Sequence, residues 1–421
     1  MVFRALKYRN FRIFFIGQGI SLTGTWMQTI AMSWLVYRMT DSAFMLGLVG
    51  FLSQIPAFIF TPFAGVLADR HNKRRMLFFT QSLAMIQAFT LGFLALTGNI
   101  EVWHIIVLGV FLGCIGALDI PVRHAFLTEM IDGKEDLGNA IALNSMMFNV
   151  TRLIGPSIAG LLIAMVGEGV CFVINGISYV AVIISLMAMK MSASDKAEIQ
   201  KKPYNILKDL KEGFDYVFGF RPIRDILLLL SVISMMGMSY AVLMPVFAKD
   251  VLGGGPHTLG FLMAAVGLGA FTGTAYLASK KNAVLLSNML PISTGIFGAG
   301  IILFSLSYVM WVSLLLLFIA GFGIMVQMAS SNTILQTIAD DDKRGRVMSF
   351  YTMAFMGMAP IGSLLAGWLA TGLGARNTLI ISGISCIIAA VIFAFRVPYL
   401  KKIVRPIYVK MGISSEIEME G

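Results

Sequence analysis

Long apolar runs alternate with short charged connectors along almost the entire chain. The first run, 11–36, contains one charged residue, Arg12, and the second run, 43–67, contains none. About 20 apolar residues are enough for a helix to cross a bilayer, whereas the strands of a membrane barrel would alternate in polarity at every second position. The runs therefore predict an all-α membrane protein. We count twelve transmembrane helices, at 11–36, 43–67, 76–97, 103–122, 138–164, 170–190, 225–248, 258–279, 284–307, 309–332, 346–371 and 377–396.

The lysines and arginines lie almost entirely in alternate connectors. Of the 32 in the chain, all but four fall in the N-terminal segment, in 69–75, 123–136, 190–224, 280–281 and 343–346, or in the C-terminal tail. The exceptions are Arg38, Lys249 and Arg376 in the opposite connectors and Arg152 inside a run. Because cytoplasmic loops carry the excess of positive charge, we expect both termini in the cytoplasm.

The composition agrees with a membrane protein, at 57% hydrophobic and only 13% charged residues. The net charge of +10 is also compatible with nucleic-acid binding. The cations, however, stand in short connectors between apolar runs, which favours anionic lipid as their partner and excludes nucleic acid.

An internal repeat divides the chain in two. At an offset of 207 residues several glycines coincide, among them Gly155 with Gly362 and Gly160 with Gly367. Two six-helix halves in parallel repeat are a transporter architecture with the cargo site between the halves. We predict an N-terminal half at 1–190, a cytoplasmic linker at 191–224, a C-terminal half at 225–396 and a cytoplasmic tail at 397–421. Within the linker, apolar residues at helical spacing predict an amphipathic surface helix; they are Leu207, Leu210, Phe214 and Val217.

The connector after the second run reads GVLADRHNKRRM, residues 65–76. It resembles the signature between helices two and three of the major facilitator superfamily, with Asn72 where a glycine is usual. Asparagine tolerates a left-handed turn. The resemblance implies a conformational gate in which Asp69 meets the N-terminus of the eleventh span; the alternative is a purely topological anchor. The matching residues are Gly65, Asp69, Arg70, Lys73 and Arg74.

A second stretch, TRLIGPSIAG at 151–160, resembles the antiporter motif of exporters in this superfamily. Gly155, Pro156 and Gly160 match, whereas Thr151 and Ala159 stand where glycines are usual. The resemblance implies export against a counter-ion. The alternative is a tight seam between two helices, since small residues let helices approach closely.

Three longer stretches resemble the bacterial enterobactin-exporter-like branch, which includes macrolide and multidrug efflux proteins. They are LDIPVRHAFLTEMI at 118–131, LGNAIALNSMMFNVTRLIGPSIAG at 137–160 and LKEGFDYVFGFRPIRDILLL at 210–229. The resemblance covers nearly the whole chain and implies the major facilitator fold in the bacterial cytoplasmic membrane. It leaves the cargo open, because members of this branch handle unrelated molecules.

Charged and polar residues inside the runs are the candidates for the transport site. A charge at the centre of a membrane helix costs about 2.5–3.5 kcal/mol and therefore marks function by default. We expect Arg152 to face the central cavity, where it pairs with an acid or receives an anionic group. Asp119 is the candidate proton carrier, with a structural ion pair to Arg123 as the alternative. Further cavity candidates are Gln18, Trp26, Gln28, Asn144, Asn149, Tyr240, Gln327 and Asn332.

These features predict a secondary transporter that exports a small amphipathic molecule, such as a siderophore, a drug or a lipid-like compound, by proton antiport and alternating access. The alternatives are uptake or uniport by the same fold, and a lipid flippase without ion coupling. The sequence has no phosphate-binding G-x-x-x-x-G-K-[ST] motif and no metal-ligand spacing. We therefore expect a monomer with no enzymatic activity, no cofactor and no metal. Its partners would be membrane lipids, protons and the cargo.

Overall fold

The computed structural model describes residues 3–131, 133–189, 206–278, 283–340 and 343–410, and these residues contain helices and no strand. The first six long helices and the linker helix are α1 (Arg9–Thr40), α2 (Ala43–Arg70), α3 (Lys73–Leu96), α4 (Val102–Glu129), α5 (Lys134–Val166), α6 (Glu168–Ala188) and α7 (Ile206–Gly219). The remaining helices are α8 (Arg221–Val232), α9 (Tyr240–Val246), α10 (Pro256–Ala278), α11 (Ala283–Leu306), α12 (Met310–Ile338), α13 (Arg344–Thr352), α14 (Met358–Ala394) and α15 (Val397–Lys410). Short π-helical turns follow α8, α9 and α13, at Ile233–Gly237 (η2), Phe247–Val251 (η3) and Met353–Gly357 (η4).

The helices account for the twelve predicted spans. Among the described residues, 10 stretches are long and apolar enough to cross a membrane. One of these, Arg344–Ala394, has 51 residues and contains two spans, because Gly374 at φ +81° breaks the helical backbone inside α14. The remaining span is α1, whose glutamines, serines and threonines lower its hydropathy. The protein is therefore an all-α membrane protein, as predicted, and the number of its spans agrees with the predicted twelve.

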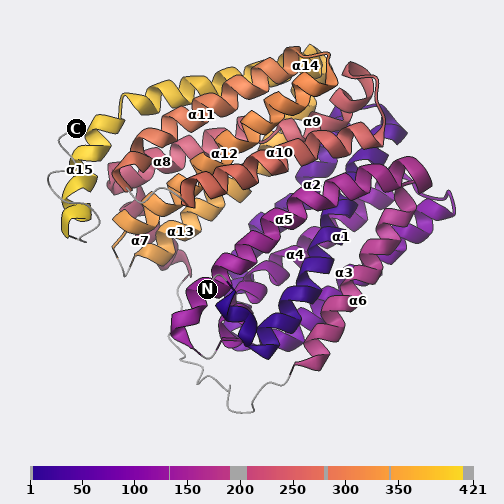
Figure 1. Cartoon of the computed structure of the whole chain (residues 1–421), viewed down its shortest axis with the longest axis horizontal. Coiled ribbons are helices and arrows are strands. Elements are labelled where there is room, and N and C mark those ends of the chain that lie inside the picture. Colours follow the sequence, from indigo (N-terminus) through magenta and orange to yellow (C-terminus); the bar gives the residue numbers. More distant parts are fainter. Residues whose placement is uncertain (1–2, 132, 190–205, 279–282, 341–342, 411–421) are drawn as a thin grey trace. The chain divides into compact units, whose positions relative to one another are not determined.

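Contacts divide the chain into two compact units. Unit 1 contains Met1–Lys201 and Met244–Ala264, and unit 2 contains Lys202–Leu243 and Ala265–Gly421. In unit 1, α1 packs against α5 and α6, α3 packs against α6, and α2 packs against α4 (Figure 1, indigo to magenta). In unit 2, α11 packs against α12 and α14, and α14 also packs against η2 (Figure 1, pink to yellow).

Glycines let equivalent helices of the two units approach closely. In unit 1, a Cβ added to Gly155 of α5 would lie 2.5 Å from the Cβ of Trp26 in α1. In unit 2, a Cβ added to Gly362 of α14 would lie 2.0 Å from the backbone oxygen of Met235 in η2. Both distances are below van der Waals contact, so neither seam accommodates a side chain. At Gly155 and Gly362 the repeat in the sequence is therefore also a repeat in helix packing.

The linker contains the predicted helix, α7. Val217 is buried, and Phe214 is half exposed and stacked on Phe218 with ring centroids 4.2 Å apart. An ion pair of 2.9 Å between Glu212 and Arg346 connects α7 to α13. These contacts attach the helix to unit 2.

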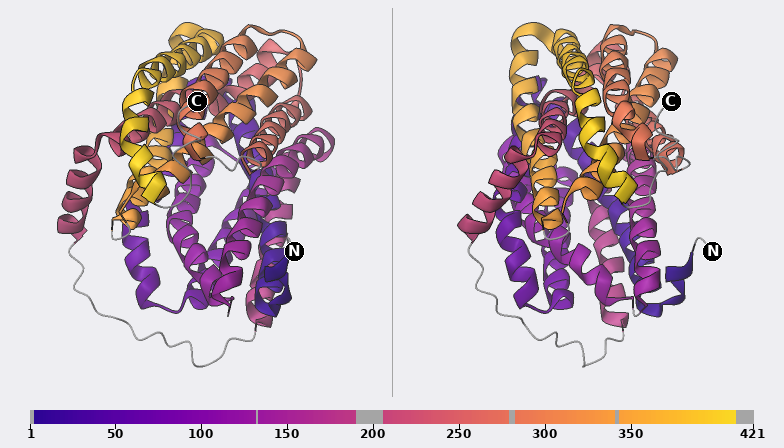
Figure 2. Two further views of the ribbon diagram at one scale, coloured as in Figure 1. Left: turned by 60° about the vertical axis from the view of Figure 1, so that its left-hand side comes forward. Right: turned by 90° about the vertical axis from the view of Figure 1, so that its left-hand side faces the viewer.

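The tail after α14 begins with a second amphipathic helix, α15, which the sequence analysis did not predict. Its buried residues, Val397, Leu400 and Val404, recur at helical spacing on one face. This helix, yellow in Figure 2, contacts α11. The tail is therefore packed onto unit 2 over these residues.

Candidate functional site

Arg152 lies near the middle of α5, on a face shared with aromatic residues. Its guanidinium carbon is 5.8 Å from the ring centroid of Trp26, and both side chains are half-buried. The Trp26 ring meets Phe148 edge to face, with centroids 5.7 Å apart and planes at 70°. Gly155, one turn after Arg152, lets the backbone of α1 approach and so places Trp26 against α5. Gly155 of the motif thus allows Trp26 to lie where its ring contacts the Arg152 guanidinium.

The charge of Arg152 has no counter-charge in the part of the chain that the structure describes. No carboxylate there forms an ion pair with it, and its one defined contact is the face of Trp26. A cation over an aromatic ring gains about 0.5–2 kcal/mol, which falls short of the roughly 2.5–3.5 kcal/mol that a mid-membrane arginine costs. Arg152 is therefore incompletely compensated and suited to an anionic group from outside the chain.

The two asparagines of α5 differ in their position relative to Arg152. Asn149 is three residues before Arg152 and so lies on the same helical face. Its amide nitrogen donates to the backbone oxygen of Ser145 at 3.0 Å. Asn144, also half-buried, lies eight residues, or about two turns, before Arg152 on the same broad face of the helix. Asn149 is therefore one turn from Arg152 and Asn144 is two turns from it.

Gln28 and Gln18 are buried inside unit 1. The amide nitrogen of Gln28 donates to Gln87 Oε1 of α3 at 3.0 Å, and its oxygen accepts from Asn175 Nδ2 of α6 at 2.7 Å. Gln18 is only 2% exposed. The sequence analysis did not single out Gln87 and Asn175, although each is a polar residue within an apolar run. Through these hydrogen bonds Gln28 connects α1 to α3 and α6.

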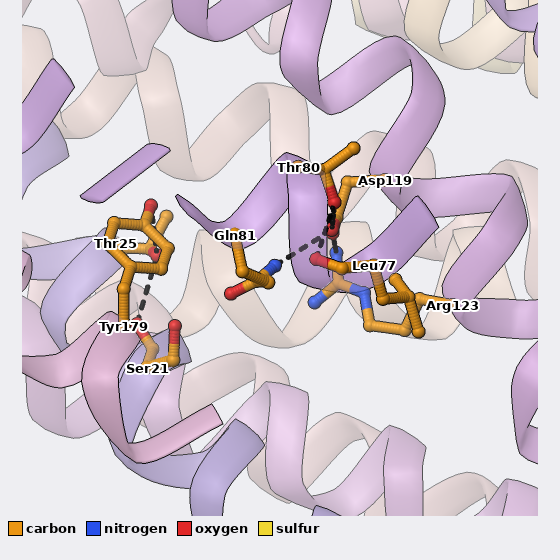
Figure 3. Close-up of polar contacts among 8 residues, drawn as sticks. All are labelled: Ser21, Thr25, Leu77, Thr80, Gln81, Asp119, Arg123 and Tyr179. Atoms are coloured by element: carbon orange, nitrogen blue, oxygen red, sulfur yellow. Dashed lines mark hydrogen bonds and ion pairs between the residues drawn. The ribbon is translucent and has the colours of Figure 1, made fainter. Parts of the chain in front are cut away.

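Asp119 of α4 is buried in a cluster of hydrogen bonds (Figure 3). Its Oδ2 pairs with Arg123 Nη2 at 3.1 Å, one helical turn away. Its Oδ1 accepts hydrogen bonds of 2.8 Å from both Thr80 Oγ1 and Gln81 Nε2 of α3. The ion pair is the arrangement that the sequence analysis gave as the alternative to a proton carrier.

Three candidates belong to unit 2. Tyr240 is buried edge to face against Phe297, with centroids 6.0 Å apart. Gln327 is completely buried and donates to Ser331 Oγ at 3.0 Å, while its own Oε1 is buried without a partner among the described atoms. Asn332 is half-buried and accepts a hydrogen bond from Gln336. Gln327 Oε1 is therefore an acceptor that water or a ligand could satisfy.

The gate signature is only partly described. The surroundings of Gly65 and the side chains of Asp69 and Arg70 lie outside what the structure describes, so the predicted contact of Asp69 stays a prediction. Lys73 pairs with Glu129 of α4 at 2.5 Å. Arg74 donates from Nε to the Leu186 oxygen at 2.7 Å, and from Nη2 to the Met187 oxygen at 3.2 Å. These two cations tie the start of α3 to the ends of α4 and α6.

Asn72 does not make the left-handed turn that its replacement of glycine suggested. Its backbone is extended, at φ −67° and ψ 111°, and its side chain accepts from the Arg75 amide at 3.0 Å. It is therefore the N-cap of α3, a position that favours asparagine because its side-chain oxygen satisfies a free helical N–H group.

The antiporter motif also forms a second close seam within unit 1. A Cβ on Gly160 would lie 2.9 Å from the Cα of Gly260 and 2.8 Å from the Pro256 oxygen, both in the first turns of α10. A Cβ on Gly260 would in turn lie 2.8 Å from the Pro156 oxygen. The motif therefore packs α5 against two helices, α1 through Gly155 and α10 through Gly160.

Known proteins resemble this chain over nearly its full length. It is 27% identical to the staphyloferrin A transporter of Staphylococcus aureus, with 91% of this chain and 95% of that protein covered. It is 23% identical to the multidrug efflux pump Tap of Mycobacterium tuberculosis, with 92% and 91% covered. The predicted resemblance to efflux proteins of the major facilitator superfamily is thus confirmed.

The fold matches solved transporters as well. A bacterial homologue of the human lysosomal transporter Spinster superposes with a TM-score of 0.75 at 12% identity, with 94% of this chain and 98% of the other covered. At this identity the likeness shows the fold alone. Residues 2–407 match the model of the family described as "transmembrane secretion effector". Because that match spans almost every residue, the chain belongs to the transmembrane secretion effector family of major facilitator superfamily transporters.

Proposed function

We propose that this transporter exports a small amphipathic molecule with an anionic group from the cytoplasm, by alternating access and proton antiport. The cargo class is a siderophore, a drug or a lipid-like compound. The observation that carries the proposal is Arg152, a cation beside Trp26 in the middle of a membrane helix whose charge is incompletely compensated by the described residues. Relatives named for an efflux pump and for a staphyloferrin A transporter support export of a small molecule.

The residues around Arg152 suit an amphipathic cargo. The guanidinium presents several donors to a carboxylate or phosphate, while Trp26 and Phe148 supply an apolar surface for the rest of the molecule. Phe148 is 44% exposed, so its ring is accessible to a bound molecule. Asn149 adds an amide on the same face. The cargo would therefore bind with its anionic group on Arg152 and its apolar part on the rings.

Inside-out vesicles with an acidic lumen test direction, coupling and charge preference together. We expect the vesicles to accumulate two anionic test compounds, carboxyfluorescein and a carboxylate siderophore. This accumulation should disappear when nigericin collapses the pH gradient. Ethidium, a cationic amphipathic dye, should not accumulate. Anion accumulation that ignores the gradient would contradict antiport. Entry of ethidium in preference to both anions would contradict the assigned cargo charge.

We also propose that Asp119 carries the coupled proton, and that protonation releases Arg123 from the ion pair. The substitution Asp119→Asn should abolish pH-driven accumulation while downhill exchange of carboxyfluorescein persists, because asparagine cannot titrate. Thr80→Val is the matched control, since it removes a hydrogen bond to the same carboxylate without changing its charge. If Asp119→Asn retains pH-driven accumulation, or if both variants lose stability alike and transport alike, Asp119 is a structural residue.

A further inference from the structure

Three arginines surround a hollow at one end of unit 2, at the start of α8 and the junction of α14 with α15. The hollow has a volume of about 380 Å³. It includes one acid and two aromatic rings. Its lining residues are Arg221, Arg224, Asp225, Phe395, Arg396 and Tyr399.

The positive charge of the hollow exceeds the negative charge. Asp225 is 9% exposed. Its carboxylate accepts hydrogen bonds from Arg396 Nη1, at 3.1 Å to Oδ1 and 3.0 Å to Oδ2. Its Oδ1 also accepts from Nε and Nη2 of Arg224, both at 3.3 Å. Arg221 forms no ion pair within the described part of the chain and lies 5.9 Å over the ring of Tyr399. Three guanidinium groups thus line the hollow together with one carboxylate, which only two of them contact, and the local charge is +2.

The position of the hollow selects its occupant. Arg221 begins the seventh span and Arg396 follows the twelfth, so by the distribution of lysine and arginine both stand at the cytoplasmic surface. Phe395, next to Arg396, is 81% exposed, and Tyr399 is 44% exposed. Cations at headgroup depth beside exposed rings match a ligand with a phosphate at one end and hydrocarbon at the other. A free anion would gain nothing from the rings.

We propose that this hollow binds the phosphodiester headgroup of an anionic phospholipid, with Arg221 as its main ligand and an acyl chain against Phe395. Arg224 and Arg396 are already oriented by Asp225 and have N–H groups beyond those that contact it. A second basic hollow, around Arg74, differs because that guanidinium already donates to two carbonyl oxygens of α6. The lipid site does not depend on the identity of the cargo.

Native mass spectrometry of the full chain in detergent tests the site, with phosphatidylglycerol and phosphatidylcholine titrated in parallel. We expect one phosphatidylglycerol molecule to bind in preference to phosphatidylcholine. Arg221→Ala should weaken the binding of phosphatidylglycerol about fivefold, which is the contribution of one basic residue at an anionic surface. Lys402→Ala is the matched control, since Lys402 is exposed on α15 outside the hollow and its removal subtracts the same charge.

Three results would overturn the proposal. They are equal binding of the two lipids, equal weakening by Arg221→Ala and Lys402→Ala, and displacement of phosphatidylglycerol by millimolar inorganic phosphate, which would indicate a site for a free anion. Arg221→Gln is a second variant if the alanine variant does not fold. Glutamine keeps the aliphatic stem that lies beside Tyr399, and this variant should weaken the binding of phosphatidylglycerol to the same extent as Arg221→Ala.

Discussion

Replacing Arg152 with alanine should lower the transport of carboxyfluorescein and of the siderophore about ten- to hundredfold, because a hydrogen bond between charged groups contributes about 1.5–3 kcal/mol. The amount of folded protein in the membrane should not fall. Arg152 forms no ion pair among the described residues, so its removal leaves no buried carboxylate unpaired and relieves the cost of a membrane charge. Vesicle uptake measures the first effect, and size-exclusion chromatography of the extracted protein measures the second.

Two further variants separate charge from shape at this site. Arg152→Lys keeps the positive charge and should retain part of the transport, because lysine provides a point charge without the planar set of donors. Trp26→Leu keeps the arginine and removes the ring beneath it, so we expect a smaller loss. Unchanged anion transport by Arg152→Ala would remove the residue from the cargo site, and loss of folded protein would make it a structural residue.

Gly362→Ala should strongly destabilise unit 2. Its Cβ would lie 2.0 Å from the Met235 oxygen and 2.8 Å from the carbonyl carbon, both backbone atoms that cannot rotate away. Added atoms in a tight seam cost about 1–3 kcal/mol, and more where the backbone must move. We expect a clear fall in the melting temperature of the detergent-solubilised protein and in its yield.

Gly372→Ala is the control for this substitution. It adds the same methyl group to the same helix, α14, at a position where nothing lies within 4 Å of the new Cβ. Its melting temperature should stay near that of the unchanged protein or rise slightly, since alanine is the better helix former. Equal melting temperatures for the two variants would contradict the close contact between α14 and η2.

The role of each polar residue within a span was not predictable from the sequence. Gln28, Asp119 and Arg152 are all polar residues within apolar runs; Gln28 and Arg152 are candidates for the cavity and Asp119 is the candidate proton carrier. Gln28 forms hydrogen bonds with residues of two other helices. Asp119 is bonded to α3 and to Arg123 of its own helix. Among the described residues, Arg152 alone of the three has an incompletely compensated charge. Hydropathy identifies a residue that is costly in lipid, but its partners come from helices far away in sequence.

Local geometry at two other positions also depended on more than residue type. Asn72 replaces a glycine and would tolerate a left-handed turn, but it caps α3 instead, because an asparagine side chain serves either purpose. The basic tail was expected only to be cytoplasmic, but α15 folds where Val397, Leu400 and Val404 find α11 to pack against. A short amphipathic helix obtains most of its stability from such packing.

By itself, the sequence determined the number of spans and the family, and it predicts the sidedness from the charge of the connectors. Each of these depends on composition summed over many residues, because a bilayer selects long apolar segments and positive loops whatever their neighbours are. Only the tertiary structure decided which glycines are contact points, which polar groups are satisfied within the protein, and that Arg221, Arg224 and Arg396 gather around one acid. Those properties depend on distances of a few ångströms between segments as much as 171 residues apart, and no local pattern encodes such distances.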